Sequence, residues 1–416
     1  MSLAQNDGAA GVATPWTTRR RVLAVIQGQR PDRLPFADRL EIWYRHHKLA
    51  GTLPEGFETL SLSAAHRHLG IGEESFSFPT SVRLRGVEMI SRFEGEIVRH
   101  ETDPVVNHFP DTYDSVPSNH VGSTETEYIT PVGTLTVEHT VHEFMVESGV
   151  ARPFLRRFPV RSAADYDTAV YILERAEPVL QAARVKKEAE RVGEDGYAVP
   201  LMRRIPFQQL LLEYLGPEEL FNGLYDHRSR VERLLEALDA HTVQMLHALE
   251  PLDEPYVEFC DNIEGSMTSP RLYVEYGLPA HQRYTDILHA QGKKVGSHAD
   301  GNLKPLLDLL RESGLDVCES VTPAPVTDCP FEVVWEAWKD GGPLIWGGIP
   351  SVLLDAETSE AEFREYFAWL FELVEDRPMI LGIGDMVMPH NIAARIRYVA
   401  REAAAHELDA ASLPGE

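Results

Sequence analysis

The stretch KKVGSHADGNLKPLLDLLRESGLDVCES, residues 293–320, contains a complete strand, helix and strand in order. KKVGSH (293–298) reads as a short strand around Val295, NLKPLLDLLRESG (302–314) has the apolar spacing of an amphipathic helix, and LDVCES (315–320) reads as a second strand. A helix between two short buried strands makes the strands parallel, because the crossover returns the chain to the same end of the sheet. This unit predicts an α/β fold with a parallel sheet.

The same alternation continues on both sides of this unit. Further short apolar strand candidates lie at 34–37, 197–202, 255–260, 343–348 and 378–383, and amphipathic helical segments separate most of them. One more strand is needed for a ring of eight, and the sequence does not show where it lies. A doubly wound sheet has a similar alternation, but the strand count favours a single (β/α)8 barrel.

Polar side chains at the strand ends also favour the barrel. In a barrel all carboxyl ends of the strands meet at one face, where barrel enzymes hold their active sites. Helix capping is the competing explanation, since each turn into a helix favours Asp, Asn or Ser. The residues at these ends are Asp38, Arg203, Arg204, Glu258, Asp261, His298, Asp300, Cys318, Glu319 and Asp385.

The region at about 82–145 has a different pattern. Its apolar residues alternate with polar ones between Gly and Pro turns, which predicts an antiparallel β insertion. A single long helix is predicted after it, at 166–193. Four polar residues of the insertion, which we interpret as a solvated strand face, are Glu138, His139, His142 and Glu143.

Composition narrows the class of protein. The formal charge is −26, from 65 acidic and 39 basic residues, which argues against a nucleic-acid or anionic-membrane surface. No apolar run approaches the roughly 18 residues of a membrane span, and no secretory signal opens the chain, so we expect a cytoplasmic protein. Residues 1–15 are expected to be disordered, and 16–410 to form one barrel domain. The three cysteines include no C-x-x-C pair.

From about Arg20 to His406 the chain resembles the uroporphyrinogen decarboxylase superfamily, which includes the decarboxylase of haem biosynthesis and corrinoid-dependent methyltransferases. The resemblance is carried by RRRVLAVIQGQRPDRLPF, by TPVGTL, by SPRLYVEYGLPAHQRYTDILHAQGKKVGSHADGN, and by the late LIWGGIP and ILGIGDMVMPHNIAARI. The family fold is a single (β/α)8 barrel. The resemblance therefore implies the same fold as the strand pattern.

Two positions separate this chain from the thiol-acting methyltransferases that it resembles. Those proteins have a His-x-Cys motif followed by Gly-Asn, and a late cysteine in a glycine turn, which together hold zinc. Here HADGN keeps His298 but has Asp300 in the place of the first thiolate, and GIGD has Asp385 in the place of the second. Carboxylate and imidazole ligands leave Zn²⁺ more electrophilic than thiolates do, which favours an O- or N-methyl substrate.

The resemblance implies a metal-dependent methyltransferase that moves a methyl group from a small methylated substrate, such as an aryl methyl ether, to the cobalt of a corrinoid protein. Cobalamin is expected on that partner, because this chain has no D-x-H-x-x-G motif. Barrels of this family often pair, so a homodimer is a further expectation. The predicted Zn²⁺ ligands are His298, Glu319 and Asp385, with Glu258 or Asp261.

Further site residues follow from the strand ends and from the aromatic residues near them. Glu319 is preferred to Cys318 because neighbours on a strand face opposite sides, and Cys318 is then a packing residue. Catalytic roles are predicted for Asp38, Asp300 and Arg203. The predicted substrate-binding residues are Trp43, Tyr44, Phe207, Tyr256 and Trp346.

Two alternatives remain at the level of the sequence. The first is a cofactor-independent decarboxylase, in which Asp38 or Asp300 stabilises a protonated pyrrole and Arg203 and Arg204 bind substrate carboxylates. The stretch RLPFADRLEIWYRHH lacks the Arg-Gly pattern that this alternative requires, and a salt bridge would equally explain the two arginines. The second is a barrel that binds a ligand without catalysis.

Overall fold

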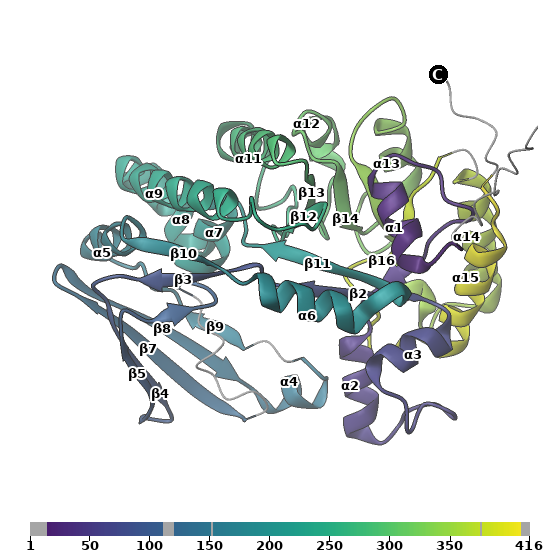
Figure 1. Ribbon diagram of the computed structural model, residues 1–416, viewed down its shortest axis with the longest axis horizontal. Coiled ribbons are helices and arrows are strands. Elements are labelled where there is room, and N and C mark those ends of the chain that lie inside the picture. The colour runs from purple at the N-terminus through teal and green to yellow at the C-terminus, as the bar shows by residue number, and fades with distance from the viewer. Residues whose placement is uncertain (1–14, 111–119, 151–152, 375–376, 409–416) are drawn as a thin grey trace, which may run out of the picture.

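Eight parallel strands form a closed ring in the computed structural model, which describes residues 15–110, 120–150, 153–374 and 377–408 (Figure 1). Each strand pairs in parallel with the next, and the backbone N–H of Leu381 donates to the carbonyl of Pro35 at 2.9 Å, which joins the last strand to the first. The (β/α)8 barrel predicted from the sequence is confirmed. In ring order the strands are β1 (Ala37–Asp38), β2 (Gly72–Ser77), β11 (Gly196–Met202), β12 (Tyr256–Phe259), β13 (Lys294–His298), β14 (Val317–Val321), β15 (Leu344–Ile349) and β16 (Ile380–Ile383).

The strand that the sequence did not reveal is β2, with the sequence GEESFS. Two adjacent glutamates hide it, because a central strand is expected to be apolar. Both are buried: Glu73 contacts Arg191 of a covering helix at 2.7 Å, and Glu74 faces the barrel interior. The missing strand therefore carries one of the carboxyl groups of the site.

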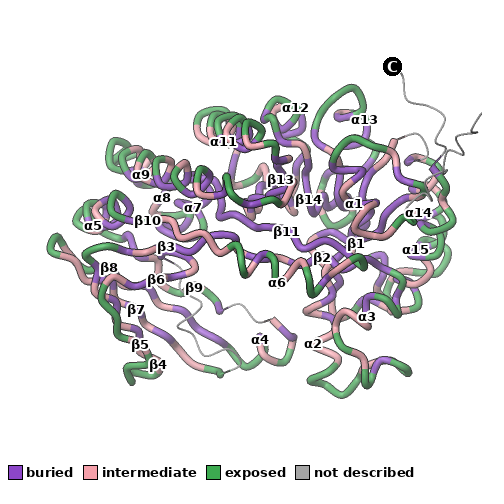
Figure 2. Tube along the Cα trace, in the orientation of Figure 1, coloured by how far each residue is buried: buried purple, intermediate pink, exposed green. Residues whose placement is uncertain are grey.

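Helices cover the ring, and their outward faces are exposed while the barrel strands are buried (Figure 2). The helix α1 (Thr18–Ile26) closes the amino-terminal end of the barrel, where Val22 and Val25 pack against Tyr197 of β11 and Trp346 of β15. No helix among the described residues is both long and apolar enough to cross a membrane. The covering helices are α2 (Glu41–Ala50), α3 (Leu62–Leu69), α6 (Ala182–Val192), α7 (Pro206–Gln209), α8 (Gly216–Asp226), α9 (Arg228–His247), α10 (Pro270–Leu272), α11 (Leu278–Ala290), α12 (Leu307–Arg311), α13 (Phe331–Ala337), α14 (Glu360–Leu373) and α15 (Ala393–Ala405).

The predicted β insertion is confirmed, and it lies between β2 and β11, at the lower left of Figure 1. It contains a three-stranded antiparallel sheet in the order β10, β3, β6 and a five-stranded one in the order β5, β4, β7, β8, β9. Its elements are β3 (Thr80–Leu84), β4 (Glu88–Phe93), β5 (Glu96–Thr102), β6 (Val105–Val106), β7 (Gly122–Thr130), β8 (Gly133–Val141), α4 (Glu143–Glu147), β9 (Phe154–Arg157), α5 (Ala163–Leu173) and β10 (Ala176–Leu180).

Two sequence expectations in this region are corrected. The long helix predicted at 166–193 is wrong, because α5 ends at Leu173 and the chain forms β10 before α6 begins. Pro178 lies in this stretch and cannot donate a helical hydrogen bond, while β10 pairs with β3. Among the four polar residues interpreted as a solvated face, His139 is fully buried. The predicted disorder at 1–15 lies outside the described residues, apart from Pro15.

Candidate metal centre

His298 is the last residue of β13, and it stands in register with Glu319 of β14. The Nδ1 atom of its ring is hydrogen-bonded to the carboxylate of Glu319, and both side chains are nearly inaccessible to solvent. Because a carboxylate accepts hydrogen bonds, this contact places a proton on Nδ1. In the neutral ring, Nε2 then has a free lone pair.

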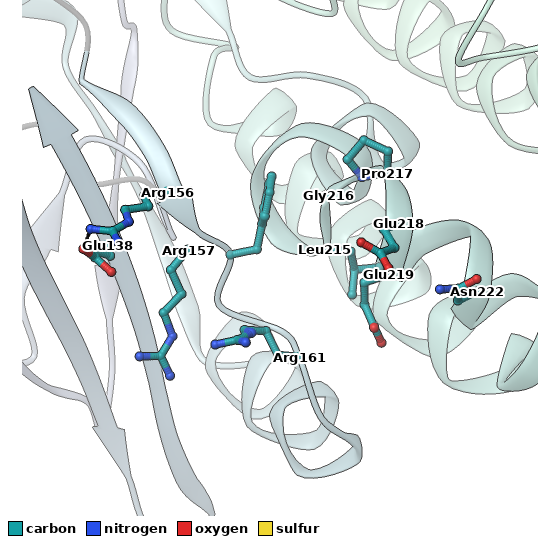
Figure 3. Close-up of a pocket in the computed structure, with 11 residues that line it drawn as sticks. Glu138, Arg156, Arg157, Arg161, Leu215, Gly216, Pro217, Glu218, Glu219 and Asn222 are labelled. Atoms are coloured by element: carbon teal, nitrogen blue, oxygen red, sulfur yellow. Dashed lines mark hydrogen bonds and ion pairs between the residues drawn. The ribbon is translucent and has the colours of Figure 1, made fainter. Parts of the chain in front are cut away.

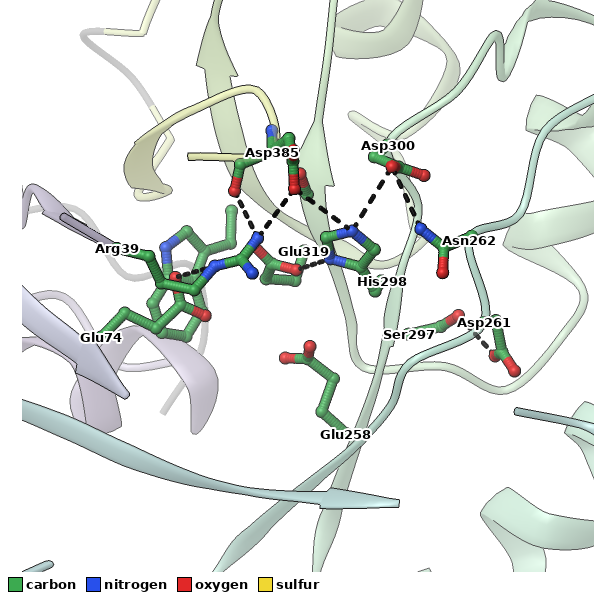
Figure 4. Close-up of polar contacts among 12 residues, drawn as sticks. Arg39, Glu74, Glu258, Asp261, Asn262, Ser297, His298, Asp300, Glu319 and Asp385 are labelled. Carbon is green, nitrogen blue, oxygen red and sulfur yellow. Dashed lines mark hydrogen bonds and ion pairs between the residues drawn. The ribbon is translucent and has the colours of Figure 1, made fainter. Parts of the chain in front are cut away.

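The Nε2 atom of His298 faces two aspartates from different loops (Figure 4). It lies 3.6 Å from Oδ2 of Asp300, just after β13, and 4.0 Å from Oδ1 of Asp385, just after β16. The two carboxylates are 27% and 40% exposed, whereas the His298 side chain is 8% exposed. We call His298, Asp300 and Asp385 the outer group, because it opens towards solvent.

A second group lies on the other side of the ring, deeper in the barrel. It consists of Glu258 of β12, His298 and Glu319, all buried, and we call it the inner group. The hydroxyl of Tyr256 donates to one carboxylate oxygen of Glu258 at 2.8 Å, and the other oxygen has no hydrogen-bond partner among the described residues. Burial and the charge of Glu319 raise the pKa of Glu258 to about 8, so it holds a proton at neutral pH.

Arg39, directly after β1, lies between the two groups and was not singled out from the sequence. Its guanidinium contacts Asp385 at 3.2 Å and approaches Glu74 at 3.9 Å. Burial, followed by the charge of Glu319, raises the pKa of Glu74 well above its ordinary value. Glu74 was missed because its strand was missed, whereas Arg39 had one signal, its position next to Asp38 at a strand end.

The site has more acidic groups than basic ones. Asp38, Glu74, Glu258, Asp300, Glu319 and Asp385 face Arg39 and His298, so six carboxyl groups accompany two basic side chains. Ionising all six carboxyl groups without a counter-ion would cost free energy, because most of them are buried away from water. Either protonation or a bound cation resolves this excess, and both solutions are consistent with the raised pKa values in the barrel and the open outer group.

Three non-glycine residues at the ends of barrel strands lie in the left-handed region. They are Asn262 after β12 (φ 52°), Ser320 in β14 (φ 64°) and Asp385 after β16 (φ 65°). The Asn262 amide donates to Asp300 Oδ2 at 3.1 Å, and the Ser320 hydroxyl accepts from the backbone N–H of Asp385 at 2.6 Å. Such backbone strain concentrates at functional sites, and here each strained residue either belongs to the outer group or positions it.

Asp261, a predicted ligand, is occupied by other contacts. Its carboxylate accepts hydrogen bonds from the backbone N–H of Ile205 (2.6 Å) and the Ser297 hydroxyl (2.7 Å), and it contacts His281 Nε2 at 3.0 Å. It belongs to neither the inner nor the outer group. In this arrangement Asp261 ties together the loops after β11 and β12.

The two predicted arginines form a buried ion-pair cluster next to the outer group. Arg203 and Arg204 both contact Glu213, and Arg204 also donates to the side-chain oxygen of Asn262 at 2.6 Å. This matches the salt-bridge explanation considered for them. Through Asn262, Arg204 is connected to Asp300.

The predicted catalytic Asp38 and the predicted aromatic residues are held by packing and hydrogen bonds, and Trp346 packs at the amino-terminal end of the barrel, away from the site. Asp38 accepts backbone N–H groups of Arg39 and Ile383, which links the first and last strands, and burial raises its pKa well above the ordinary value. Trp43 and Trp346 donate their indole N–H groups to backbone carbonyls, and Phe207 stacks on Tyr276. Of the five aromatic residues, Tyr44 is partly exposed, and the structure buries Trp43, Phe207, Tyr256 and Trp346.

The fold and the site define a (β/α)8-barrel protein with a histidine–carboxylate cluster at the carboxyl ends of its strands. Residues 209–331 match the family model of uroporphyrinogen decarboxylase (URO-D), which agrees over this segment with the resemblance seen in the sequence. The matched segment contains His298, Asp300 and Glu319.

Among solved structures, the chain matches a methyltransferase from Methanosarcina mazei, with 14% identity over 94% of this chain and 100% of that one and a TM-score of 0.49. A Bacteroidetes-affiliated GH5 cellulase is also similar, with 14% identity, 56% and 75% coverage and a TM-score of 0.36. The comparison with curated proteins found no match.

Proposed function

We propose that the protein is a metal-dependent methyltransferase that takes the methyl group of a small O- or N-methylated compound, such as an aryl methyl ether, for transfer to the cobalt of a corrinoid protein. The observation that carries the proposal is the outer group. Its three residues occupy the positions at which the thiol-acting relatives recognised in the sequence have histidine and two cysteines. The family match over 209–331 supports an enzyme of this superfamily.

We assign a Zn²⁺ site to His298 Nε2, Asp300 and Asp385. Tetrahedral zinc with bonds of about 2.0–2.2 Å separates its ligand atoms by about 3.4 Å, close to the 3.6 and 4.0 Å between Nε2 and the two carboxylates. Zinc bound there would supply Lewis acidity to the leaving atom of the substrate. Three protein ligands with an exposed side are the usual pattern of a catalytic rather than a structural zinc site.

Glu319 then has a different role from the one predicted from the sequence. It accepts the Nδ1–H of His298 and so fixes the tautomer in which Nε2 points at Asp300 and Asp385. Metal-binding histidines commonly have such a carboxylate partner, which orients the ring and increases its basicity. Asn262 and Arg39 hold the two aspartates in the same way, through contacts at 3.1 and 3.2 Å.

Glu258 provides a proton inside the barrel. Because its pKa is raised to about 8, its carboxyl group is protonated at neutral pH, next to the ring that carries the outer group. A demethylated oxygen or nitrogen needs a proton, and Glu258 is our candidate donor. The decarboxylase alternative receives less support, because Arg203 and Arg204 are already held by Glu213.

Zinc content and methyl transfer together test the proposal. We expect the purified full chain to hold about one zinc per barrel and to methylate free cob(I)alamin from a methoxylated aromatic compound. The variants D300N and D385N should lose both properties, while D308N, at an exposed position of α12, should keep both. Zinc-free protein that still transfers methyl groups would refute the metal site, and zinc-loaded protein inactive on all methylated compounds would refute the reaction.

A further inference from the structure

A cavity of about 720 Å³ lies away from the metal centre, between the β insertion and the barrel (Figure 3). One wall comes from β9 and the segment that follows it, and the other from the start of α8. None of its lining residues belongs to the inner or outer group. The proposed methyltransferase reaction therefore does not account for it.

Three arginines line the wall on the side of the insertion. Arg156 contacts the carboxylate of Glu138 at 3.0 Å. Arg157 and Arg161, by contrast, have no side-chain hydrogen bond or ion pair with any residue in the part of the chain that the structure describes, and Nε of Arg157 is buried without a partner. Arg161 is exposed and Arg157 is half-buried, so both guanidinium groups are open to a ligand that enters the cavity from solvent.

The acidic residues of the opposite wall do not neutralise these arginines. Glu218 and Glu219 lie in the first turn of α8, where the positive end of the helix dipole stabilises their negative charges. Burial, followed by the charge of Glu219, raises the pKa of Tyr166 to about 12, which places this carboxylate near the tyrosine hydroxyl. In Figure 3 no contact connects Glu218 or Glu219 to Arg157 or Arg161.

Gly216 and Phe158, which both line the cavity, are in close contact with each other. Gly216 adopts a φ of +75°, and the ring of Phe158 lies so close that a Cβ at Gly216 would come within 2.6 Å of it. A side chain there would have to displace Phe158. The arrangement leaves an apolar surface beside two cationic groups, which suits a small organic anion or phosphate compound.

We infer that this cavity is a binding site for a small oxyanion, a carboxylate or a phosphate, held by Arg157 and Arg161. Guanidinium groups bind both kinds of oxyanion through paired N–H donors, so they share one recognition chemistry. The ligand would bridge the β insertion and α8. The inference is independent of the proposed methyl transfer.

Calorimetric titration of the full chain with inorganic phosphate, and separately with succinate, tests the inference. We expect saturable binding of at least one of them, weakened about tenfold or more in R157Q and in R161Q, the scale of one lost charge-assisted hydrogen bond. R157K should fall between wild type and R157Q, because it keeps the charge but loses the paired donors. Phosphate binding alone would identify a phosphate ligand, and succinate binding alone a carboxylate.

Two variants with the same change of charge serve as controls. R85Q alters an exposed arginine of the β insertion that pairs with Glu177 and does not line the cavity, and R364Q alters an exposed arginine of α14 that pairs with Glu360. Both should bind like wild type. Absence of saturable binding of either anion would overturn the inference, and so would equal weakening in all the arginine variants, which would indicate general charge attraction.

Discussion

The two sides of the His298 ring carry the same kind of chemical group under opposite conditions. On the inner side Glu258 is fully buried and its pKa is raised to about 8 by burial and by Glu319. On the outer side burial alone would raise the pKa of Asp300, but the contacts with His298 and Asn262 lower it to about 2. Burial, neighbouring charges and hydrogen-bond donors together, rather than residue type, therefore decide which carboxyl holds a proton and which remains an anion available to a cation.

The variant H298A should disrupt both the inner and the outer group, because His298 belongs to each. It removes the atom that faces Asp300 and Asp385 and also the partner of Glu319, so we expect zinc affinity to fall by more than about 100-fold, beyond the usual effect of losing an orienting contact. Competition with a chromogenic chelator measures it. H289A, which removes a partly exposed histidine that pairs with Asp316, is the control and should keep its zinc.

Comparing D300N with E258Q tests which side of the ring holds the ion. If the outer group binds zinc, D300N should weaken zinc binding by at least about tenfold, while E258Q, which replaces a protonated carboxyl by a neutral amide, should change it little. The same chelator competition applies. A larger loss in E258Q than in D300N would place the ion in the inner group and contradict our assignment.

The role of Glu319 can be separated from that of a ligand. We expect E319A to weaken zinc binding by about 10- to 100-fold, as for other carboxylates that orient a histidine. E319Q should restore part of the affinity, because its amide oxygen still accepts the Nδ1–H. Cobalt(II) substitution gives a spectroscopic check: a spectrum that changes its ligand-field pattern in E319Q would mean that Glu319 is itself a ligand.

His241 of α9 provides a smaller test, because burial alone, with no contribution from a carboxylate, shifts the pKa of this histidine. Burial lowers its pKa to about 4, whereas the carboxylates around His298 raise that pKa well above 6.5 despite burial. The unfolded chain binds the proton first, so the contribution of His241 to folding stability falls as pH drops from about 6.5 towards 4. Between pH 7 and pH 5 this histidine should cost about 2 kcal/mol, which urea denaturation measures as the difference between the pH dependence of wild type and that of H241Q. An unchanged pH dependence in H241Q would contradict this.

Most of the barrel could be predicted from the sequence, because central strands are short apolar runs separated by amphipathic helices. The failures have local causes: two glutamates hide β2, and the helical pattern on both sides of Pro178 conceals β10. Neither strand can be recognised from its own residues. Recognising β2 requires knowing that Glu74 faces other ionisable groups, and recognising β10 requires knowing that it pairs with β3.

The candidate site was predictable to the extent that strand ends converge. His298, Glu319 and Asp385 could be placed at one face, and the structure brings them together. Sequence alone could not decide which nitrogen of His298 faces which carboxylate, because this depends on the register between β13 and β14. It also could not show that Asp261 is occupied by Ser297 and Ile205, since those contacts join the loops after β11 and β12 to strand β13.

The pairing of β3 with β10 has a consequence for how the chain folds. β2 and β11 are neighbours in the ring, yet the whole insertion separates Ser77 from Gly196 along the chain. Antiparallel pairing of Thr80 with Leu180 brings the two ends of the insertion together beside the barrel. Once this stem has formed, joining β2 to β11 no longer requires closing a long flexible loop, which lowers the entropic barrier to completing the ring. The rate at which the barrel forms should therefore depend on residues that never touch the candidate metal centre.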